Sequence, residues 1–256
     1  MALTPADTLP TPASDRIAGI AIATATVVST LFVALDRGGG GTTPQQVLQG
    51  IAGLARLKEI VHGVAIASVC AYGFGYAALA RRLGLQRPHV LVGLIVYLIG
   101  CMAMVVATTL DGFVIPHVAI DGAANPERVR FAYDLVHYLN VVLNDFAKLG
   151  WVLQAVGALA WSLALLQRTR FGRAVGVVGL LSSTLVCAIV LGSATSMSMT
   201  ALLGVLLAQL LWNVAAAIFL VWRPKHAVEG THFGAAAVAE RESPRPTGQS
   251  TLESAL

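Results

Sequence analysis

Charged residues are scarce in this 256-residue chain: Asp, Glu, Lys and Arg together make up 12% of it. An ordinary soluble domain carries about 25%. Hydrophobic residues reach 56% and the mean hydropathy is +0.75, so the composition excludes an ordinary soluble domain and predicts an integral membrane protein. The formal net charge of +4 comes from basic residues that flank apolar stretches. We therefore expect the lipid bilayer as a partner and no nucleic acid.

Cysteine is also scarce, and its spacing excludes the usual cysteine-based sites. Cys70, Cys101 and Cys187 lie inside apolar segments and form no CxxC pair, so we expect buried free thiols. The glycine run at 38–41 lacks the following Lys-Ser/Thr of a phosphate-binding loop, and neither a nucleophile elbow nor an HExxH motif is present. Whether the protein is an enzyme is left open by the sequence.

Long apolar runs are what the chain has in abundance. A helix needs about 20 apolar residues to cross about 30 Å of hydrocarbon. Six stretches meet this requirement, at about 17–35, 60–80, 90–110, 150–167, 174–191 and 200–222. The sequence therefore predicts an all-α, six-helix transmembrane bundle over residues 17–223.

Basic residues predict the orientation of this bundle. They gather in alternate connections, namely Arg81, Arg82 and Arg87, then Arg168, Arg170 and Arg173, and finally Arg223 and Lys225. Because cytoplasmic loops are enriched in Lys and Arg, we predict a multi-pass inner-membrane protein with both termini cytoplasmic. Residues 1–16 then form a cytoplasmic N-terminal segment. The polar composition after Gly230 predicts a disordered cytoplasmic tail over 224–256.

Two outward connections carry helix start signals. Thr43-Pro44 and Asn125-Pro126 each place a capping side chain before a proline that fits the first helical turn. Apolar residues follow Pro44 at helical spacing, so we predict that the second membrane helix starts outside the membrane and continues inward. Helical extensions over about 42–59 and 111–148 would together form an outward-facing cap.

Three features around the third span are interpreted as breaks in its helix. Asp111-Gly112 and Asp121-Gly122 are dipeptides typical of turns. Pro116, between them, is expected to kink or end a helix because it lacks a backbone N–H.

Polar side chains gather at two depths when 1.5 Å per residue is counted outward from the arginines. The first level spans about 8 Å at the outer edge of the hydrocarbon and holds His62, Asp111, Asn144, Asp145 and Lys148. The second lies about 10 Å farther out and holds Asp134, His137 and His117. Along the fourth helix, one polar stripe runs through His137, Asn140, Asn144 and Lys148. Such groups are costly at the membrane edge unless paired, which predicts an outward-facing functional pocket.

Metal-dependent chemistry is one hypothesis for this pocket. Imidazole and carboxylate ligands suit Zn, Cu or Fe, and the candidate ligands are His62, His117, His137 and Asp134. In an enzyme, His137 would act as general base, Asp111 as carboxylate ligand or orienting group, and Lys148 as the stabiliser of negative charge. The substrate, a small amphipathic or membrane-borne molecule, would contact binding residues Asn140, Asn144 and Asp145.

Other cofactors receive less support. Haem held by His62 and His137 is disfavoured because the depth count separates the two by about 18 Å. Met197 and Met199 lie in the connection before the sixth span and could ligate Cu(I), although methionine at a membrane interface is more often packing material.

Two non-enzymatic functions remain as alternatives. In a proton-coupled small-solute transporter, Asp111, Asp145 and Lys148 would change protonation as the bundle rearranges. In an accessory subunit of a membrane complex, the outer cap would dock a partner subunit. Gln209 and Asn213 in the sixth span are expected to hydrogen-bond a neighbouring helix rather than a substrate.

Overall fold

The computed structural model describes residues 12–35, 40–193 and 198–222, and these form helices and no strands. The elements are α1 (Pro12–Leu35), α2 (Pro44–Gly53), α3 (Ala55–Leu83), α4 (Pro88–Thr109), the π-helix η2 (Leu110–Val114), α5 (Ile115–Ala124), the 3-10 turn η3 (Pro126–Arg128), α6 (Val129–Leu166), α7 (Arg170–Gly192) and α8 (Met199–Val221). Six helical stretches among the described residues are long and apolar enough to cross a membrane. The protein is therefore a multi-pass helical membrane protein, as predicted. The predicted tail over 224–256 lies outside the described residues.

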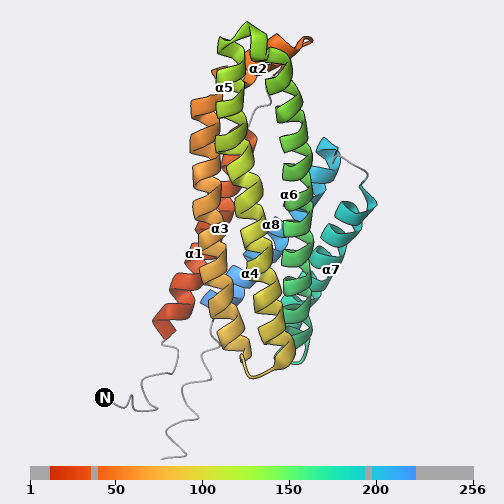
Figure 1. The fold of residues 1–256 in the computed structure, drawn as a ribbon. Helices are drawn as coiled ribbons and strands as arrows, with labels where there is room; N and C mark the ends of the chain where they lie inside the picture. The colour runs from red at the N-terminus through yellow and green to blue at the C-terminus, as the bar shows by residue number, and fades with distance from the viewer. Residues whose placement is uncertain (1–11, 36–39, 194–197, 223–256) are drawn as a thin grey trace, which may run out of the picture. The chain divides into compact units, whose positions relative to one another are not determined.

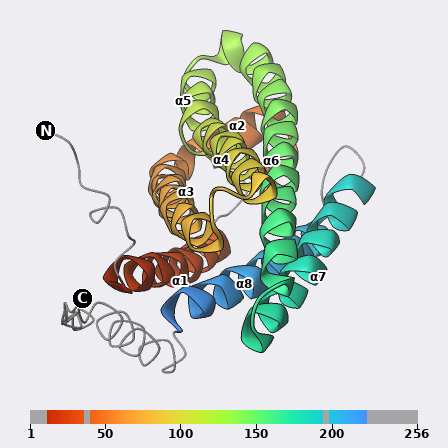
Figure 2. The same ribbon diagram turned by 90° about the horizontal axis from the view of Figure 1, so that it is seen from below.

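The membrane helices form a ring in which each packs against two neighbours, in the order α1, α3, α4, α6, α7 and α8, with α8 returning to α1 (Figures 1 and 2). Small residues allow the closest of these contacts. A Cβ on Gly100 would lie 2.9 Å from the carbonyl oxygen of Gly150, and one on Gly157 would lie 2.7 Å from the carbonyl oxygen of Gly93. The backbones of α4 and α6 can approach this closely only because those positions lack side chains.

One end of the ring, here called the arginine end, holds the α3–α4 and α6–α7 connections (Figure 1). Arg82 Nη1 donates hydrogen bonds to the carbonyls of Phe219 (2.7 Å) and Leu220 (3.0 Å), and Arg168 Nη2 donates to that of Leu83 (2.9 Å). These arginines satisfy carbonyls at the C-termini of α8 and α3, where a positive charge is also favoured by the helix dipole. That this end faces the cytoplasm stays a prediction.

The opposite end, here called the cap end, consists of α2, α5 and the first turns of α6. Its buried apolar cluster is made of Leu48, Ile51, Ile115, Ala119, Ala132 and Val136. Both predicted start signals are present in it. The Thr43 side chain accepts a hydrogen bond from the Gln46 N–H, and the Asn125 side chain accepts one from the Glu127 N–H. At 38 residues, α6 is about 57 Å long and extends well past a hydrocarbon layer of about 30 Å.

Two helix boundaries differ from the prediction. The first helix begins at Pro12 rather than near residue 17, with Asp15 in its first turn, where an acidic residue is favoured by the helix dipole. The second does not run on from the Thr43-Pro44 start: α2 ends at Gly53, and Leu54 (φ −102°, ψ 0°) separates it from α3. Gly50 and Gly53 weaken helix continuity, while the apolar side of α2 is buried against the cap.

The interpretation of the Asp-Gly dipeptides as turns was wrong. Asp111-Gly112 lies in η2 and Asp121-Gly122 in α5, within one helical stretch that runs from Pro88 to Ala124. The glycines serve close packing instead. A Cβ on Gly112 would lie 2.3 Å from His62 Cβ, and one on Gly122 would lie 2.3 Å from Ala132 Cβ. The helical stretch continues through Pro116, which lies in the first turn of α5 just after the π turn.

Candidate functional site

A cavity of about 380 Å³ lies inside the ring and is lined by residues of α1, α3, α4, α6 and α8 together with η2. Apolar side chains make up much of its wall, including Ala65, Val69, Met104, Ala107 and Leu206. Its lining includes one imidazole, that of His62 from α3, and one carboxylate, that of Asp111 from η2. The cavity therefore combines a mainly apolar wall with a small charged site near the cap end.

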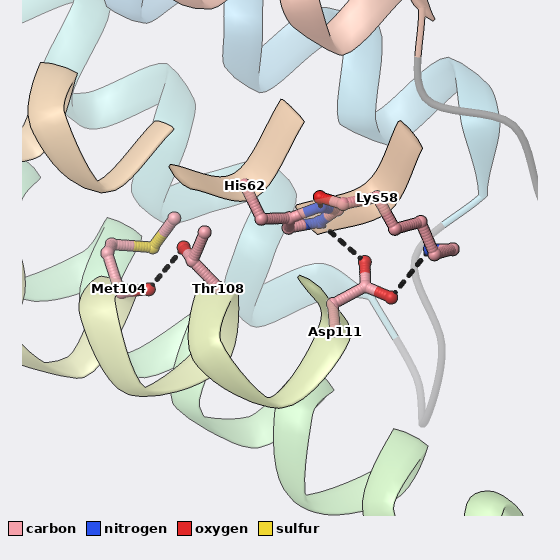
Figure 3. A network of polar contacts seen from close by, with 5 residues as sticks. All are labelled: Lys58, His62, Met104, Thr108 and Asp111. Carbon is pink, nitrogen blue, oxygen red and sulfur yellow. Dashed lines mark hydrogen bonds and ion pairs between the residues drawn. The ribbon is translucent and has the colours of Figure 1, made fainter. Parts of the chain in front are cut away.

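The charged site is a triad of Lys58, His62 and Asp111 (Figure 3). Lys58 Nζ lies 2.8 Å from Asp111 Oδ1, and His62 Nε2 lies 3.0 Å from Asp111 Oδ2. The side chains of Lys58 and His62 are each 9% exposed, against 26% for Asp111. One carboxylate thus joins two basic side chains, and it is the member of the triad that is most accessible.

Both ring nitrogens of His62 face oxygen acceptors. Nδ1 lies 2.8 Å from the carbonyl oxygen of Lys58, one turn earlier in α3, and so carries a proton that it donates. A neutral imidazole has only one N–H. The contact between Nε2 and Asp111 therefore needs a second proton, carried either by His62 as imidazolium or by Asp111 as carboxylic acid. The pair therefore holds one proton between Nε2 and Oδ2.

The local sequence around each residue determines where the three side chains of the triad lie. Lys58 and His62 are four residues apart, which places them on the same face of α3. Asp111 lies in the π-helix η2, whose wider turn closes with the Ile115 N–H bonding to the Leu110 carbonyl. Single π turns inside α-helices occur frequently at functional sites. Gly112, with no side chain, allows η2 to pack directly against the His62 ring.

A second group of polar side chains lines the cavity farther toward the arginine end. Tyr72 Oη lies 3.0 Å from Ser29 Oγ and donates to Thr26 Oγ1 at 3.2 Å. Asn213 of α8 also lines the cavity, and its Oδ1 accepts a hydrogen bond of 2.5 Å from the Tyr76 hydroxyl. Asn213 therefore bonds another helix, as expected, although α3 is not one of the two helices that α8 packs against in the ring.

Aromatic side chains fill the ring beyond the cavity. The Tyr76 ring stacks on Trp161 at 5.3 Å between centroids and on Trp212 at 6.1 Å. None of the three residues is more than 2% exposed. This stack occupies the ring interior between the cavity and the arginine end.

The structure brings together only some of the residues singled out from the sequence. His62 and Asp111 meet, and Asn144 lines the same cavity while its Nδ2 donates to the Asn140 carbonyl at 2.8 Å. Lys148 is half-buried and does not line the cavity. Three further candidates on α6, His137, Asn140 and Asp145, are exposed.

The predicted metal ligands are not gathered at one place. Among the described residues, no group of three or more His, Cys, Asp or Glu side chains is placed to hold a metal ion. His62 has both nitrogens engaged, whereas His117 is exposed and its Nδ1 donates to the carbonyl of Phe113 in its own helix. Asp134 pairs with Arg130 at 3.3 Å on the surface of α6.

The haem hypothesis can be compared with the structure, whereas the copper hypothesis concerns residues that are only partly described. His62 lines the cavity whereas His137 is exposed, so the structure does not form the His62–His137 haem pair. Of the two methionines considered as copper ligands, Met197 lies outside the described residues, and only the backbone of Met199, at the start of α8, is described.

Sequence reasoning missed Lys58. The residue lies in the stretch assigned to the outward helical extension over about 42–59, and the depth count on this helix included only His62. The four-residue spacing between Lys58 and His62 was the available signal, because such pairs share a helix face.

Comparison of the chain with protein family models, with curated protein sequences and with solved structures found no match. Its function therefore has to be argued from the geometry of the cavity and the triad.

Proposed function

We propose that this multi-pass membrane protein binds an elongated amphipathic molecule in the cavity of its helix ring, with the polar head of that molecule at Asp111. The observation that carries the proposal is the cavity itself: about 380 Å³, mainly apolar, with His62 and Asp111 in its wall. Small-molecule sites are typically about 300–1,000 Å³, largely apolar, and contain a few placed polar groups. The cavity meets each of these criteria.

The three charged residues take different roles in this proposal. Asp111 is the contact group, because its carboxylate lines the cavity and keeps unused lone pairs beside its bonds to Lys58 and His62. Lys58 and His62 are positioning residues that hold the carboxylate. His62 cannot serve as a general base in this arrangement, since both of its nitrogens are already bonded. Binding, rather than acid–base chemistry at His62, is therefore the function the geometry supports.

Transport would require a larger rearrangement of packed side chains than binding does. A solute that leaves the cavity toward the arginine end would have to separate Tyr76 from Trp161 and Trp212, three residues that are at most 2% exposed. Binding needs no such movement. Docking of a partner on the cap, as an accessory subunit, is compatible with a bound ligand.

Fluorescence of Trp151, which lines the cavity, provides a test. The probe is a twelve-carbon alcohol with bromine at its chain end, a heavy-atom quencher, added to the protein in lipid nanodiscs. The difference between wild type and Trp151→Phe isolates the signal of Trp151. We expect quenching that saturates as the probe fills the cavity.

A cavity-filling variant and its matched control decide the outcome. Ala65 lines the cavity, whereas Ala67, two residues along the same helix, is exposed on the other face. Ala65→Leu should raise the half-saturating concentration at least about tenfold, because added methylenes overpack an occupied site. Ala67→Leu should leave it unchanged. Quenching that rises linearly with probe, or that is equal in both variants, would show partition into lipid and overturn the proposal.

A further inference from the structure

The acceptor atoms of Asp111 decide which chemical group can bind at the charged end of the cavity. His62 also lines the cavity, but its two ring nitrogens are engaged with the Lys58 carbonyl and with Asp111. Lys58 itself does not line the cavity. A ligand head therefore meets the unused lone pairs of the Asp111 side chain here, and lone pairs bind a hydrogen-bond donor.

The negative charge of this carboxylate is already balanced by its two neighbours. Lys58 Nζ lies 2.8 Å from Oδ1, and His62 Nε2 lies 3.0 Å from Oδ2 with a proton between them (Figure 3). If His62 binds that proton, the carboxylate faces an imidazolium, and if Asp111 binds it, the carboxyl group is neutral. In both cases a cationic head would add a positive charge beside the Lys58 ammonium, and like charges repel more strongly in a partly buried site than in water.

An anionic head is excluded for a different reason. The most accessible member of the triad is the carboxylate itself, which is 26% exposed against 9% for Lys58 and for His62. The oxygens of an anion would lie against the lone pairs of Asp111 before they could reach either basic group. An uncharged O–H or N–H donor is the head group that suits the site.

The other polar side chains of the cavity are amides and hydroxyls, among them Gln154, Gln209, Ser68 and Thr108. Ser68 and Thr108 donate to backbone carbonyls of their own helices, at 2.9 Å and 2.5 Å. Hydrogen bonds in which one partner is ionised are roughly twice as strong as bonds between neutral groups. Asp111 provides the one carboxylate in this lining, so a single donor head favours Asp111 over the amides and hydroxyls.

From this arrangement we infer that the ligand carries an uncharged hydrogen-bond donor at its head, a hydroxyl or a primary amide, and neither an ammonium group nor an anion. The inference rests on the proposed binding function and names the class of molecule that the same cavity takes. A long-chain alcohol represents this class. Its hydroxyl donates to Asp111, and its chain lies against the apolar wall.

Displacement of the brominated alcohol, in nanodiscs of zwitterionic lipid, tests the inference. The three competitors share a twelve-carbon chain and differ at the head: the primary alcohol, its methyl ether, which has no O–H, and the primary amine. The amine is protonated at neutral pH because alkylamines, like lysine, titrate at about pH 10. With concentrations expressed per lipid to correct for partition, we expect the alcohol to displace the probe at a concentration at least about tenfold lower than the ether or the amine.

Removal of the positive charge at Lys58 tests the charge balance. Lys58→Gln keeps a hydrogen-bond donor but loses the ammonium, so the amine should gain at least about threefold in affinity relative to the alcohol. Lys58→Met serves the same purpose if the glutamine variant does not fold. Arg56→Gln, at an exposed residue two positions earlier in α3, is the matched control and should leave the ratio of the two affinities unchanged.

The outcomes separate the inference from the binding function. An alcohol that displaces the probe no better than its methyl ether would show that no donor is recognised, and an amine that displaces it as well as the alcohol would show a site for cations. Either result, or an amine-to-alcohol ratio in folded Lys58→Gln equal to that of wild type, would overturn the uncharged head and keep the binding function. Failure of all three competitors to displace the probe would overturn the binding function itself.

Discussion

His62 and Asp111 are 49 residues apart in the chain, and their side chains meet at 3.0 Å between Nε2 and Oδ2. The contact joins the first turns of α3 to the π turn that interrupts the α4–α5 stretch. Because His62 Nδ1 already donates to the Lys58 carbonyl, the pair must share a further proton. The charged site therefore depends on the backbone of two helices as well as on three side chains.

Replacing Asp111 by Asn tests the charge of the triad at nearly constant volume. The amide keeps the shape but removes the negative charge that Lys58 and His62 face, so two basic groups that are each 9% exposed lose their counter-charge. Bonds to charged groups contribute about 1.5–3 kcal/mol, and we expect a loss of stability in that range. Thermal unfolding in nanodiscs at a fixed scan rate measures it, and affinity for the brominated alcohol should fall in parallel.

Asp121→Asn is the matched control for that substitution. Asp121 is exposed in α5, ten positions after Asp111 in the same continuous stretch, so its charge should contribute little. Equal effects of the two substitutions on unfolding temperature would show that the triad does not stabilise the fold.

Replacing Gly112 by Ala tests the close approach of η2 to α3. The new methyl group would lie 2.3 Å from His62 Cβ and 2.7 Å from its Cγ, so the helices must separate. Overpacking of this kind costs about 1–3 kcal/mol. Gly63→Ala, one residue after His62 with nothing within 4 Å of the added carbon, should be neutral or stabilising by up to about 1 kcal/mol. A Gly112→Ala protein as stable as Gly63→Ala would contradict the packing described here.

The orientation of the bundle is testable apart from its chemistry. A reporter fused after Arg87 should be active in the cytoplasm, and one fused near Asn125 should be active outside, because the arginine-rich connections are predicted to face the cytoplasm. The structure brings the α3–α4 and α6–α7 connections to one end, where Arg168 donates to the Leu83 carbonyl. Opposite reporter signals would place the charged site on the cytoplasmic side.

The sequence was sufficient to predict the fold class and the membrane spans because bilayer thickness sets a minimum apolar length. Depth counting also placed His62 and Asp111 at one level, where they meet. It put Lys148 at that level too, yet Lys148 does not line the cavity while Asn144, one turn earlier in α6, does. Counting residues gives height along an axis and says little about rotation around it, which depends on how neighbouring helices pack.

The features that escaped prediction depend on tertiary contacts. The Asp-Gly dipeptides are typical of turns in isolation, but in the folded chain Gly112 and Gly122 provide room for His62 and Ala132. The break at Leu54 follows from burial of the apolar side of α2 in the cap. Neither contact leaves a local pattern in the sequence.

The hydrogen bond between Tyr76 and Asn213 offers the last test, because both partners are buried and lie where the cavity meets the aromatic stack. Tyr76→Phe keeps the stacking with Trp161 and Trp212 but leaves Asn213 Oδ1 without the 2.5 Å donor. A buried acceptor left without a partner costs about 1–3 kcal/mol. Asn213→Leu should cost a similar amount, since the Tyr76 hydroxyl then loses its acceptor.

The double variant separates a hydrogen bond from simple packing. Replacement of both partners by apolar groups can be nearly neutral, so Tyr76→Phe combined with Asn213→Leu should be more stable than the sum of the single losses predicts. Thermal unfolding of the four proteins gives this coupling energy directly. Tyr138→Phe, at a tyrosine that is 68% exposed, controls for loss of a hydroxyl alone. Strictly additive losses would mean that the two residues stabilise the ring independently, and that the end of the cavity next to the aromatic stack is held by the stack rather than by this bond.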